Sequence, residues 1–319
     1  MYFRAILPFL VASATATQNK LLQIPNSEFG PNPSNVSFYL YIPTKLASNP
    51  PVLVNPHWCH GSAQAAFTGT QLATLADTYG YIMIFPSSPN TADYCWDVSS
   101  PATLTHNGGG DSRGIVSMVD YVLKKYKADP RRVFSMGTSS GAMMTNVLLG
   151  AYPDVFAAGS AWAGVAFGCY ADAKGGVNTW SDACATGKVV KSGGEWKGIV
   201  EGGFPGYKGW RPKMHVLHGT VDEVLAVQNL EEEIKEWTAV LGLGNVTAVV
   251  RENDINAGWT TQSWSVGGVE RFRATKAKGV THNIQTDAET VLNWFDLKCK
   301  GPGCFSRPSN SRFGRRAVI

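Results

Sequence analysis

A serine flanked by two glycines is the residue of this chain best suited to chemistry. Gly137, Ser139 and Gly141 lie between an apolar stretch (132–136) typical of a buried strand and an apolar stretch (140–149) typical of a packed helix. On such a strand-to-helix corner the serine hydroxyl is exposed, and the helix N-terminus directs free N–H groups at the place where an oxyanion forms. The segment therefore predicts that Ser139 is a nucleophile.

A serine nucleophile needs a base, and the base needs an acid that orients it. Asp222 directly follows a predicted strand (214–218), and His282 lies on a loop before the last predicted helix. An aspartate at such a place is often only a cap, and a loop histidine often only a surface residue. The chain order serine, acid, histidine is nevertheless that of hydrolases built on a parallel sheet. We therefore predict Ser139, Asp222 and His282 as the catalytic residues.

The oxyanion needs two N–H donors, the second of which usually comes from the loop after an early strand. The predicted strand 51–55 runs into such a loop, so we predict the backbone N–H groups of Cys59 and Ser140 as the oxyanion hole. His57 and His60 in this loop could instead bind a metal. Two imidazoles without a carboxylate or third histidine nearby make a weak metal site, so we expect them to line or brace the loop.

Strand-like and helix-like stretches alternate along the chain, which favours an α/β fold with a mostly parallel sheet covered by helices on both faces. The predicted strands are 37–42, 51–55, 81–85, 132–136, 157–162 and 214–218, with 247–251 and 269–274 extending one edge. The predicted helices are 71–78, 114–126, 140–149, 230–241 and 287–297. Residues 175–210 are expected to be a long insertion, and 17–304 a single catalytic domain.

The two ends of the chain are expected to lie outside this domain. Residues 1–16 have a basic start, an apolar run and a small-residue cleavage site, which predicts a signal peptide and a secreted protein. A membrane span needs about 20 apolar residues, so no membrane partner is expected. Residues 305–319 are predicted to be a disordered basic tail. Sequons at Asn35 and Asn245 predict N-glycosylation.

The net charge of +4 comes from these ends, because one arginine before residue 17 and four after residue 304 leave −1 for residues 17–304. A nearly neutral domain argues against a nucleic-acid partner. We expect a monomer.

Six cysteines in a secreted chain favour up to three disulfides. Short loops favour the pairs Cys169–Cys184 and Cys299–Cys304, which leaves Cys59–Cys95 as the third predicted pair. A zinc site is the alternative, but the cysteines and histidines lack the spacing that it requires.

Beyond these separate features, seven segments together resemble the fungal acetylxylan esterases of carbohydrate esterase family 1, relatives of feruloyl esterases and polyhydroxyalkanoate depolymerases. The segments are 59–64, 95–98, 108–112, 137–146, 151–153, 210–214 and 218–222. The resemblance covers about residues 43–304. It implies an α/β-hydrolase fold, hydrolysis of acetyl esters on xylan, no metal or organic cofactor, and the same three catalytic residues. Thr281 and His60 depart from the family pattern, which puts rate and substrate preference in question.

Tryptophans on segments near the expected catalytic edge could stack on sugar rings, wall an acyl pocket or fill the core. We predict Trp162, Trp96 and Trp259 as substrate-binding residues, with Trp162 closing a small acyl pocket that prefers acetyl groups. Feruloyl esterase and polyester depolymerase are the alternative enzymes. A catalytically silent carbohydrate-binding protein on a hydrolase scaffold is the alternative from another class.

Overall fold

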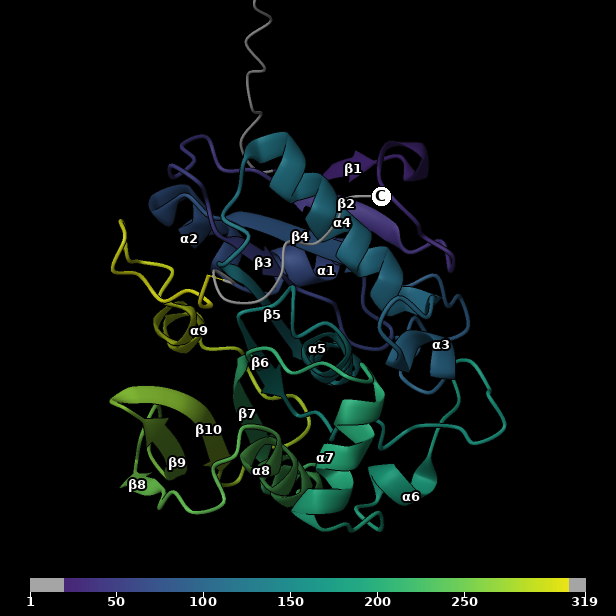
Figure 1. The fold of residues 1–319 in the computed structure, drawn as a ribbon, viewed down its shortest axis with the longest axis vertical. Helices are drawn as coiled ribbons and strands as arrows, with labels where there is room; N and C mark the ends of the chain where they lie inside the picture. Colours follow the sequence, from purple (N-terminus) through teal and green to yellow (C-terminus); the bar gives the residue numbers. More distant parts are fainter. Residues whose placement is uncertain (1–19, 310–319) are drawn as a thin grey trace, which may run out of the picture.

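The computed structural model describes residues 20–309, so the predicted signal peptide (1–16) lies outside the described residues. Its strands form one sheet in the order β1-β2-β4-β3-β5-β6-β7-β10-β9-β8 (Figure 1). The strands are β1 (Leu22–Ile24), β2 (Ser37–Tyr41), β3 (Val52–Val54), β4 (Ile82–Ser87), β5 (Val133–Thr138), β6 (Ala158–Trp162), β7 (Lys213–Gly219), β8 (Val249–Glu252), β9 (Trp259–Val266) and β10 (Val269–Ala277).

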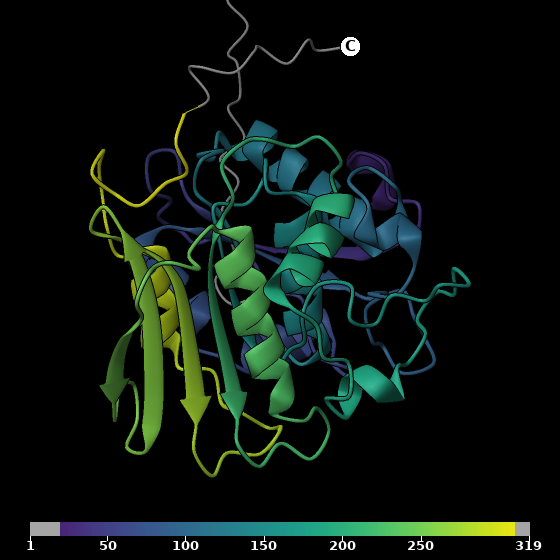
Figure 2. The same cartoon turned by 60° about the horizontal axis from the view of Figure 1, so that its bottom comes forward.

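The strands from β4 to β10 in this order run parallel, and antiparallel strands complete both edges. Figure 2 shows β10 parallel to β7 and antiparallel to β9. Strand β5 in the middle is buried at every position except its last residue, as expected of a strand covered on both faces.

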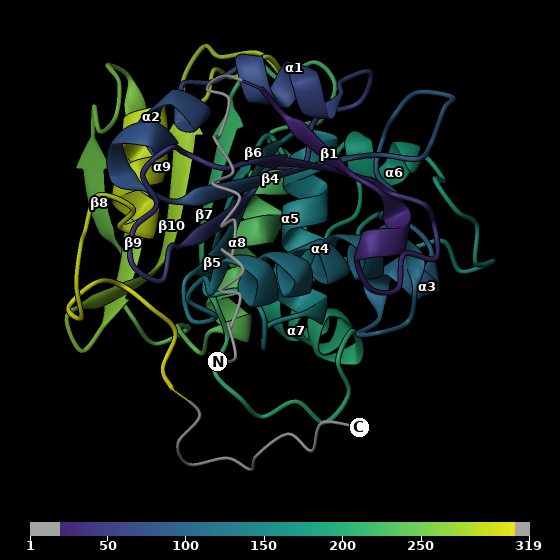
Figure 3. The same cartoon turned by 90° about the horizontal axis from the view of Figure 1, so that it is seen from above.

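Helices cover both faces of the sheet. They are α1 (Ala63–Thr68), α2 (Leu72–Tyr79), α3 (Pro101–Leu104), α4 (Gly110–Tyr126), α5 (Ser140–Ala151), α6 (Asp182–Ala185), α7 (Gly193–Gly202), α8 (Gln228–Val240) and α9 (Ala288–Phe295), with a short 3₁₀ turn at Asn26–Glu28. The buried side chains of α4, α5, α7 and α8 belong to one hydrophobic cluster, and those of α1, α2 and α9 to another. Figures 1 and 3 show α2 and α9 on one side of the sheet, with α4, α5 and α7 on the other. The predicted α/β class is confirmed.

The predicted edge of the sheet needs a correction. We expected 247–251 and 269–274 to extend one edge, and they do so as β8 and β10, but β9 (Trp259–Val266), which the sequence patterns missed, lies between them. In β9, the polar residues Thr261 and Ser263 are buried like Trp259 and Trp264, whereas Thr260 and Gln262 are only partly buried. The insertion 175–210 contains α6 and α7, and α7 begins with a capping box made by Ser192 and Glu195.

The predicted tail also needs a correction at its beginning. The Phe305 N–H donates to Asp296 Oδ2 at 2.8 Å, and the Arg307 N–H donates to the Arg131 carbonyl at 2.9 Å. The Phe305 ring stacks near Phe134 of β5. Residues 305–307 are therefore docked against the domain, and 310–319 lie outside the described residues.

The three predicted disulfides, Cys59–Cys95, Cys169–Cys184 and Cys299–Cys304, are all formed. Within residues 20–309, every helix is too short or too polar to cross a bilayer.

Candidate active site

Ser139 occupies the corner between β5 and α5, in a backbone conformation that few residues adopt. Its φ and ψ are 56° and −123°, and its N–H donates to the Trp162 carbonyl of the next strand at 2.9 Å. A Cβ on Gly137 would lie 2.4 Å from the Gly141 backbone, and one on Gly141 would lie 2.1 Å from the Pro56 carbonyl oxygen. Only glycine fits at these two positions, so the two glycines allow the corner that presents the serine hydroxyl.

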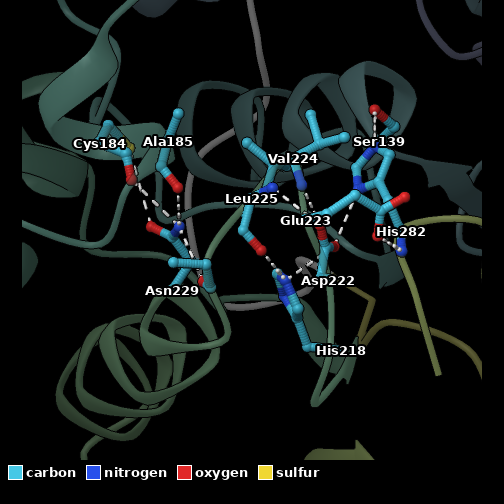
Figure 4. A network of polar contacts seen from close by, with 11 residues as sticks. Ser139, Cys184, Ala185, His218, Asp222, Glu223, Val224, Leu225, Asn229 and His282 are labelled. Carbon is cyan, nitrogen blue, oxygen red and sulfur yellow. Dashed lines mark hydrogen bonds and ion pairs between the residues drawn. The ribbon is translucent and has the colours of Figure 1, made fainter. Parts of the chain in front are cut away.

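The structure brings Ser139 together with the two predicted partners, which come from the loops after β7 and β10. His282 Nε2 lies 2.8 Å from Ser139 Oγ, and His282 Nδ1 lies 2.8 Å from Asp222 Oδ2 (Figure 4). The two loops are joined directly, because the His282 N–H donates to Glu223 Oε2 at 3.1 Å and the Val221 N–H donates to the Val280 carbonyl at 3.1 Å. The three side chains thus form one hydrogen-bonded series.

The surroundings of Asp222 favour its ionised form. Burial opposes ionisation, but hydrogen bonds from His218, His282 and the Leu225 N–H outweigh it and hold the pKa of Asp222 below its usual range. A carboxylate that stays charged keeps a hydrogen on His282 Nδ1, which leaves Nε2 free to accept the proton of Ser139.

A cavity of about 620 Å³ opens beside these side chains, within the range of about 300–1,000 Å³ typical of small-ligand sites. Ser139 and His282 line it together with buried apolar side chains, Trp96, Met143 and Tyr170. Residues with exposed tryptophan side chains, Trp58 and Trp180, line it as well. The geometry places the predicted nucleophile, Ser139, and the predicted base, His282, at the wall of a partly apolar cavity.

Comparisons with known proteins identify the kind of enzyme. Residues 36–257 match the family model described as "Esterase PHB depolymerase". The chain belongs to this esterase family. It is 45% identical to acetylxylan esterase A of Emericella nidulans, over 88% of this chain and 90% of the relative. It is 42% identical to feruloyl esterase B of Thermothelomyces thermophilus, over 93% of this chain and 100% of the relative.

The solved structure of an acetyl xylan esterase from Aspergillus awamori matches 87% of this esterase and 99% of that chain, with a TM-score of 0.83 and 39% identity. Esterase PE8, at 13% identity and a TM-score of 0.51, covers 83% of this chain and 99% of its own and shares the fold alone. With these relatives, the chain is a carboxylic ester hydrolase with the α/β-hydrolase fold.

The two predicted oxyanion donors of the esterase, Cys59 and Ser140, both line the cavity. Among residues 20–309, neither of their backbone N–H groups donates to a protein acceptor. The disulfide to Cys95 holds the Cys59 loop, and Ser140 is the first residue of α5. Both N–H groups are therefore available to a ligand oxygen at the site.

His57 braces the loop in front of the cavity. Its ring is fully buried, Nδ1 donates to the Trp58 carbonyl at 2.7 Å, and Nε2 accepts from the Ser88 N–H at 3.1 Å. Burial lowers the pKa of His57, so the ring is neutral and both nitrogens are used by the backbone. His60 is exposed and lines the cavity.

The structure contradicts two of the three tryptophan predictions. Trp162 is fully buried in the hydrophobic cluster that also contains α9, and its indole N–H donates to Ser160 Oγ at 2.9 Å. Trp259 is 8% exposed and belongs to the same cluster. Neither lines the cavity, because their side chains lie in the core on the α9 face of the sheet. Trp96 does line it, at 2% exposure.

The insertion supplies cavity residues that the sequence patterns missed. Its loop is fixed to the domain because the Asn178 N–H donates to Asp97 Oδ1 at 3.3 Å and the Thr179 N–H donates to Ser99 Oγ at 3.0 Å. This places Trp180, 51% exposed, at the cavity. The only sequence signal was an aromatic residue in a polar, glycine-rich stretch.

Proposed function

We propose that this esterase is a secreted acetylxylan esterase that releases acetate from acetylated xylan through an acyl-Ser139 intermediate. The series of contacts from Ser139 through His282 to Asp222, beside a cavity of ligand size, carries the proposal. Relatives named acetylxylan esterase supply the substrate class.

The signal-like segment 1–16 and the three disulfides support export, because disulfides persist in oxidising compartments. The predicted glycosylation sites, Asn35 and Asn245, are both exposed, as such a modification requires. Protein purified from the culture medium is expected to begin at Thr17, and a mature chain that retains Met1 would contradict export.

In the first step, His282 Nε2 takes the proton of the Ser139 hydroxyl while Oγ attacks the carbonyl carbon of the acetyl ester. The N–H groups of Cys59 and Ser140 hold the resulting oxyanion, each stabilising the transition state by about 3 kcal/mol. His282 then gives its proton to the xylose oxygen as the carbon–oxygen bond of the ester breaks. The sugar hydroxyl leaves, and the acetyl group remains on Ser139.

In the second step, His282 takes a proton from water, and the water oxygen attacks the acetyl carbon. The bond to Ser139 Oγ breaks, the serine regains its proton from His282, and acetate leaves. Throughout, Asp222 keeps the ring of His282 oriented and stabilises its protonated form.

The bulky side chains at the cavity favour a small acyl group. Trp96, Met143 and Tyr170 are 2%, 6% and 4% exposed, so they occupy fixed positions in the wall. Identity of 42% to feruloyl esterase B makes feruloyl ester hydrolysis the second candidate. The exposed indoles of Trp58 and Trp180 suit stacking on the rings of a sugar chain.

The test compares kcat/KM on acetylated xylan, methyl ferulate and a short-chain polyhydroxyalkanoate, with Ser139→Ala as the matched inactive protein. We expect acetylated xylan to be turned over best, and Ser139→Ala to lose about 10⁴-fold or more with an unchanged circular dichroism spectrum. Better turnover of methyl ferulate would identify a feruloyl esterase. Full activity of the folded alanine variant would remove Ser139 from the mechanism.

A further inference from the structure

A second histidine contacts the carboxylate of the site. Asp222 Oδ2 lies 2.8 Å from His282 Nδ1 and 3.2 Å from Nε2 of His218, the residue before the end of β7. The side chains of both His218 and Asp222 are 0% exposed. Figure 4 shows the two imidazoles converging on Asp222. One carboxylate oxygen therefore serves two histidines, of which only His282 reaches Ser139.

The surroundings of His218 determine where its proton lies. Its Nε2 is 2.9 Å from the Leu225 carbonyl oxygen, which can only accept a hydrogen bond. Nε2 must therefore carry a hydrogen, which it shares between Leu225 and Asp222 Oδ2. His218 is a donor to the carboxylate whether its ring is neutral or protonated.

This donor completes the hydrogen bonding of Asp222. The other oxygen, Oδ1, accepts from the N–H groups of Val224 and Leu225 at 2.9 and 2.8 Å. A carboxylate offers about four lone-pair positions, and here two backbone groups and two imidazoles occupy them. The carboxylate plane is therefore fixed by groups on both oxygens, and Oδ2 is held where His282 needs it.

Resting on the proposed function, we propose that His218 is a positioning residue of this esterase. Its Nε2–H holds Asp222 Oδ2 toward His282 and withdraws part of that oxygen's charge. Without this donor, Oδ2 presents more negative charge to the ring of His282 and stabilises its protonated form, so the fall in activity on the acidic side of the pH–rate profile is expected to move to higher pH.

Other charged groups lie near His218 and Asp222, and their effect on the pH dependence must be distinguished from that of His218. Glu223 accepts the His282 N–H through Oε2. On α8, Glu233 is fully buried and interacts electrostatically with His218, and burial raises the pKa of Glu233 to about 7. Glu236, one turn along α8, interacts with Glu233 and is also buried. Because Glu233 titrates near the range of a histidine, Glu233→Gln is a necessary control.

The experiment measures kcat/KM on 4-nitrophenyl acetate from pH 4 to 9 for His218→Leu, which lacks a donor, and His218→Gln, whose amide can replace Nε2–H without titrating. Activity is expected to fall on the acidic side of the profile of kcat/KM against pH, which we call the acidic limb. We expect His218→Leu to move this limb to higher pH by about half a pH unit or more and to lower kcat about tenfold with little change in KM. His218→Gln should restore the limb to within about 0.2 units of wild type.

The matched control is His215→Gln on the same strand. His215 is also fully buried, but its Nε2 contacts Thr275 Oγ1 and its ring has no contact with Asp222. We expect this variant and Glu233→Gln to keep the wild-type limb. Should His218→Leu fail to fold, His218→Asn keeps a polar group too short to reach Asp222 and is expected to shift the limb in the same way.

A lower melting temperature with an unmoved limb in His218→Leu or His218→Asn would show that His218 only supports the fold, and would overturn the proposal. A limb that moves in Glu233→Gln would assign the titration to Glu233 and overturn it equally. Neither result affects the proposed function, whose own tests are the activity of Ser139→Ala and the comparison of ester substrates.

Discussion

The hydroxyl of Ser140 accepts a hydrogen bond from the backbone N–H of Trp96 at 2.8 Å, across 44 residues of chain. Both residues are 2% exposed, and the indole N–H of Trp96 donates in turn to the His57 carbonyl at 2.7 Å. The first turn of α5, the cavity wall and the oxyanion loop are therefore one hydrogen-bonded unit. A side chain beside the nucleophile connects the helix that follows Ser139 to the wall of the substrate cavity.

Ser140→Ala tests the role of the Ser140 hydroxyl apart from that of the Ser140 backbone N–H, which we place in the oxyanion hole. The variant keeps the N–H donor but leaves the buried Trp96 N–H without a partner, which we expect to cost about 1–3 kcal/mol in the free energy of unfolding. Activity should fall less than tenfold, far less than in Ser139→Ala. Urea denaturation and kcat on 4-nitrophenyl acetate measure the two effects. Unchanged stability would show that the hydrogen bond contributes nothing.

The Cys59–Cys95 disulfide joins the oxyanion loop to the loop segment that carries Trp96. It spans 36 residues of sequence, so replacing both cysteines by alanine is expected to cost about 4 kcal/mol by loop entropy and also to lower kcat. The Cys299–Cys304 disulfide spans 5 residues and does not line the cavity, so its removal should cost about 2 kcal/mol and leave kcat unchanged. Equal loss of kcat in the two double variants would contradict a role for the first bridge in the site.

The corner that carries Ser139 could be predicted from the sequence, whereas the side chains that line the cavity could be predicted only in part. Gly137 and Gly141 each stand two residues from Ser139, and close backbone neighbours (Gly141 at Gly137, the Pro56 carbonyl at Gly141) allow only glycine there, so a short sequence motif predicts the corner. The indole of Trp162 could not be placed in the same way, because the face of the sheet that it occupies depends on packing against α9. Trp180 lies at the cavity through a ring contact with Tyr170 and through the hydrogen bonds of its loop to Asp97 and Ser99, which join segments about 80 residues apart.

Two neighbouring glutamates of α8 should respond oppositely to pH. Burial raises the pKa of Glu233 from 4.5 to about 7, so the unfolded chain binds fewer protons between these values. The free energy of unfolding contributed by Glu233 therefore falls as pH rises from about 4.5 to about 7. At Glu232, burial opposes ionisation, but bonds from Lys235, Trp196 and Lys191 outweigh it and lower its pKa, so its contribution is present above 4.5 and is lost in acid.

Urea denaturation of Glu232→Gln and Glu233→Gln from about pH 3 to about pH 8 measures this contrast, because the contribution of Glu232 is lost only below about pH 4.5. We expect Glu232→Gln to be less stable than wild type at pH 7, with the difference shrinking as the pH falls. The free energy of unfolding of wild type should decline as the pH rises toward 7, and this decline should be smaller in Glu233→Gln. Parallel stability curves for both variants and wild type would refute the assignment of opposite shifts.

Trp58→Ala tests whether the exposed tryptophans bind the sugar chain. The Trp58 side chain is 36% exposed at the cavity, and the contacts it makes to His57 and Gly61 use its backbone carbonyl, which alanine retains. Loss of one stacking surface should raise KM for acetylated xylan by about tenfold, corresponding to about 1.4 kcal/mol, and leave 4-nitrophenyl acetate unaffected. An equal rise of KM on both esters would place Trp58 against the acyl group instead.

Trp162→Ala is the counterpart in the core, and the structure reverses the effect expected from sequence alone. The indole is 0% exposed and packs in the cluster that contains α9, so its removal leaves a cavity inside the domain and should cost about 3–5 kcal/mol in the free energy of unfolding. Because Trp162 does not line the substrate cavity, the ratio of kcat/KM for methyl ferulate to that for acetylated xylan should stay at the wild-type value. Its backbone carbonyl, which accepts the Ser139 N–H, is kept in alanine, so the folded fraction should remain active. Denaturant titration measures the stability, and kcat/KM on methyl ferulate and on acetylated xylan is measured at temperatures below the unfolding transition. A raised ratio of methyl ferulate to acetylated xylan turnover without loss of stability would show that Trp162 does line the acyl pocket.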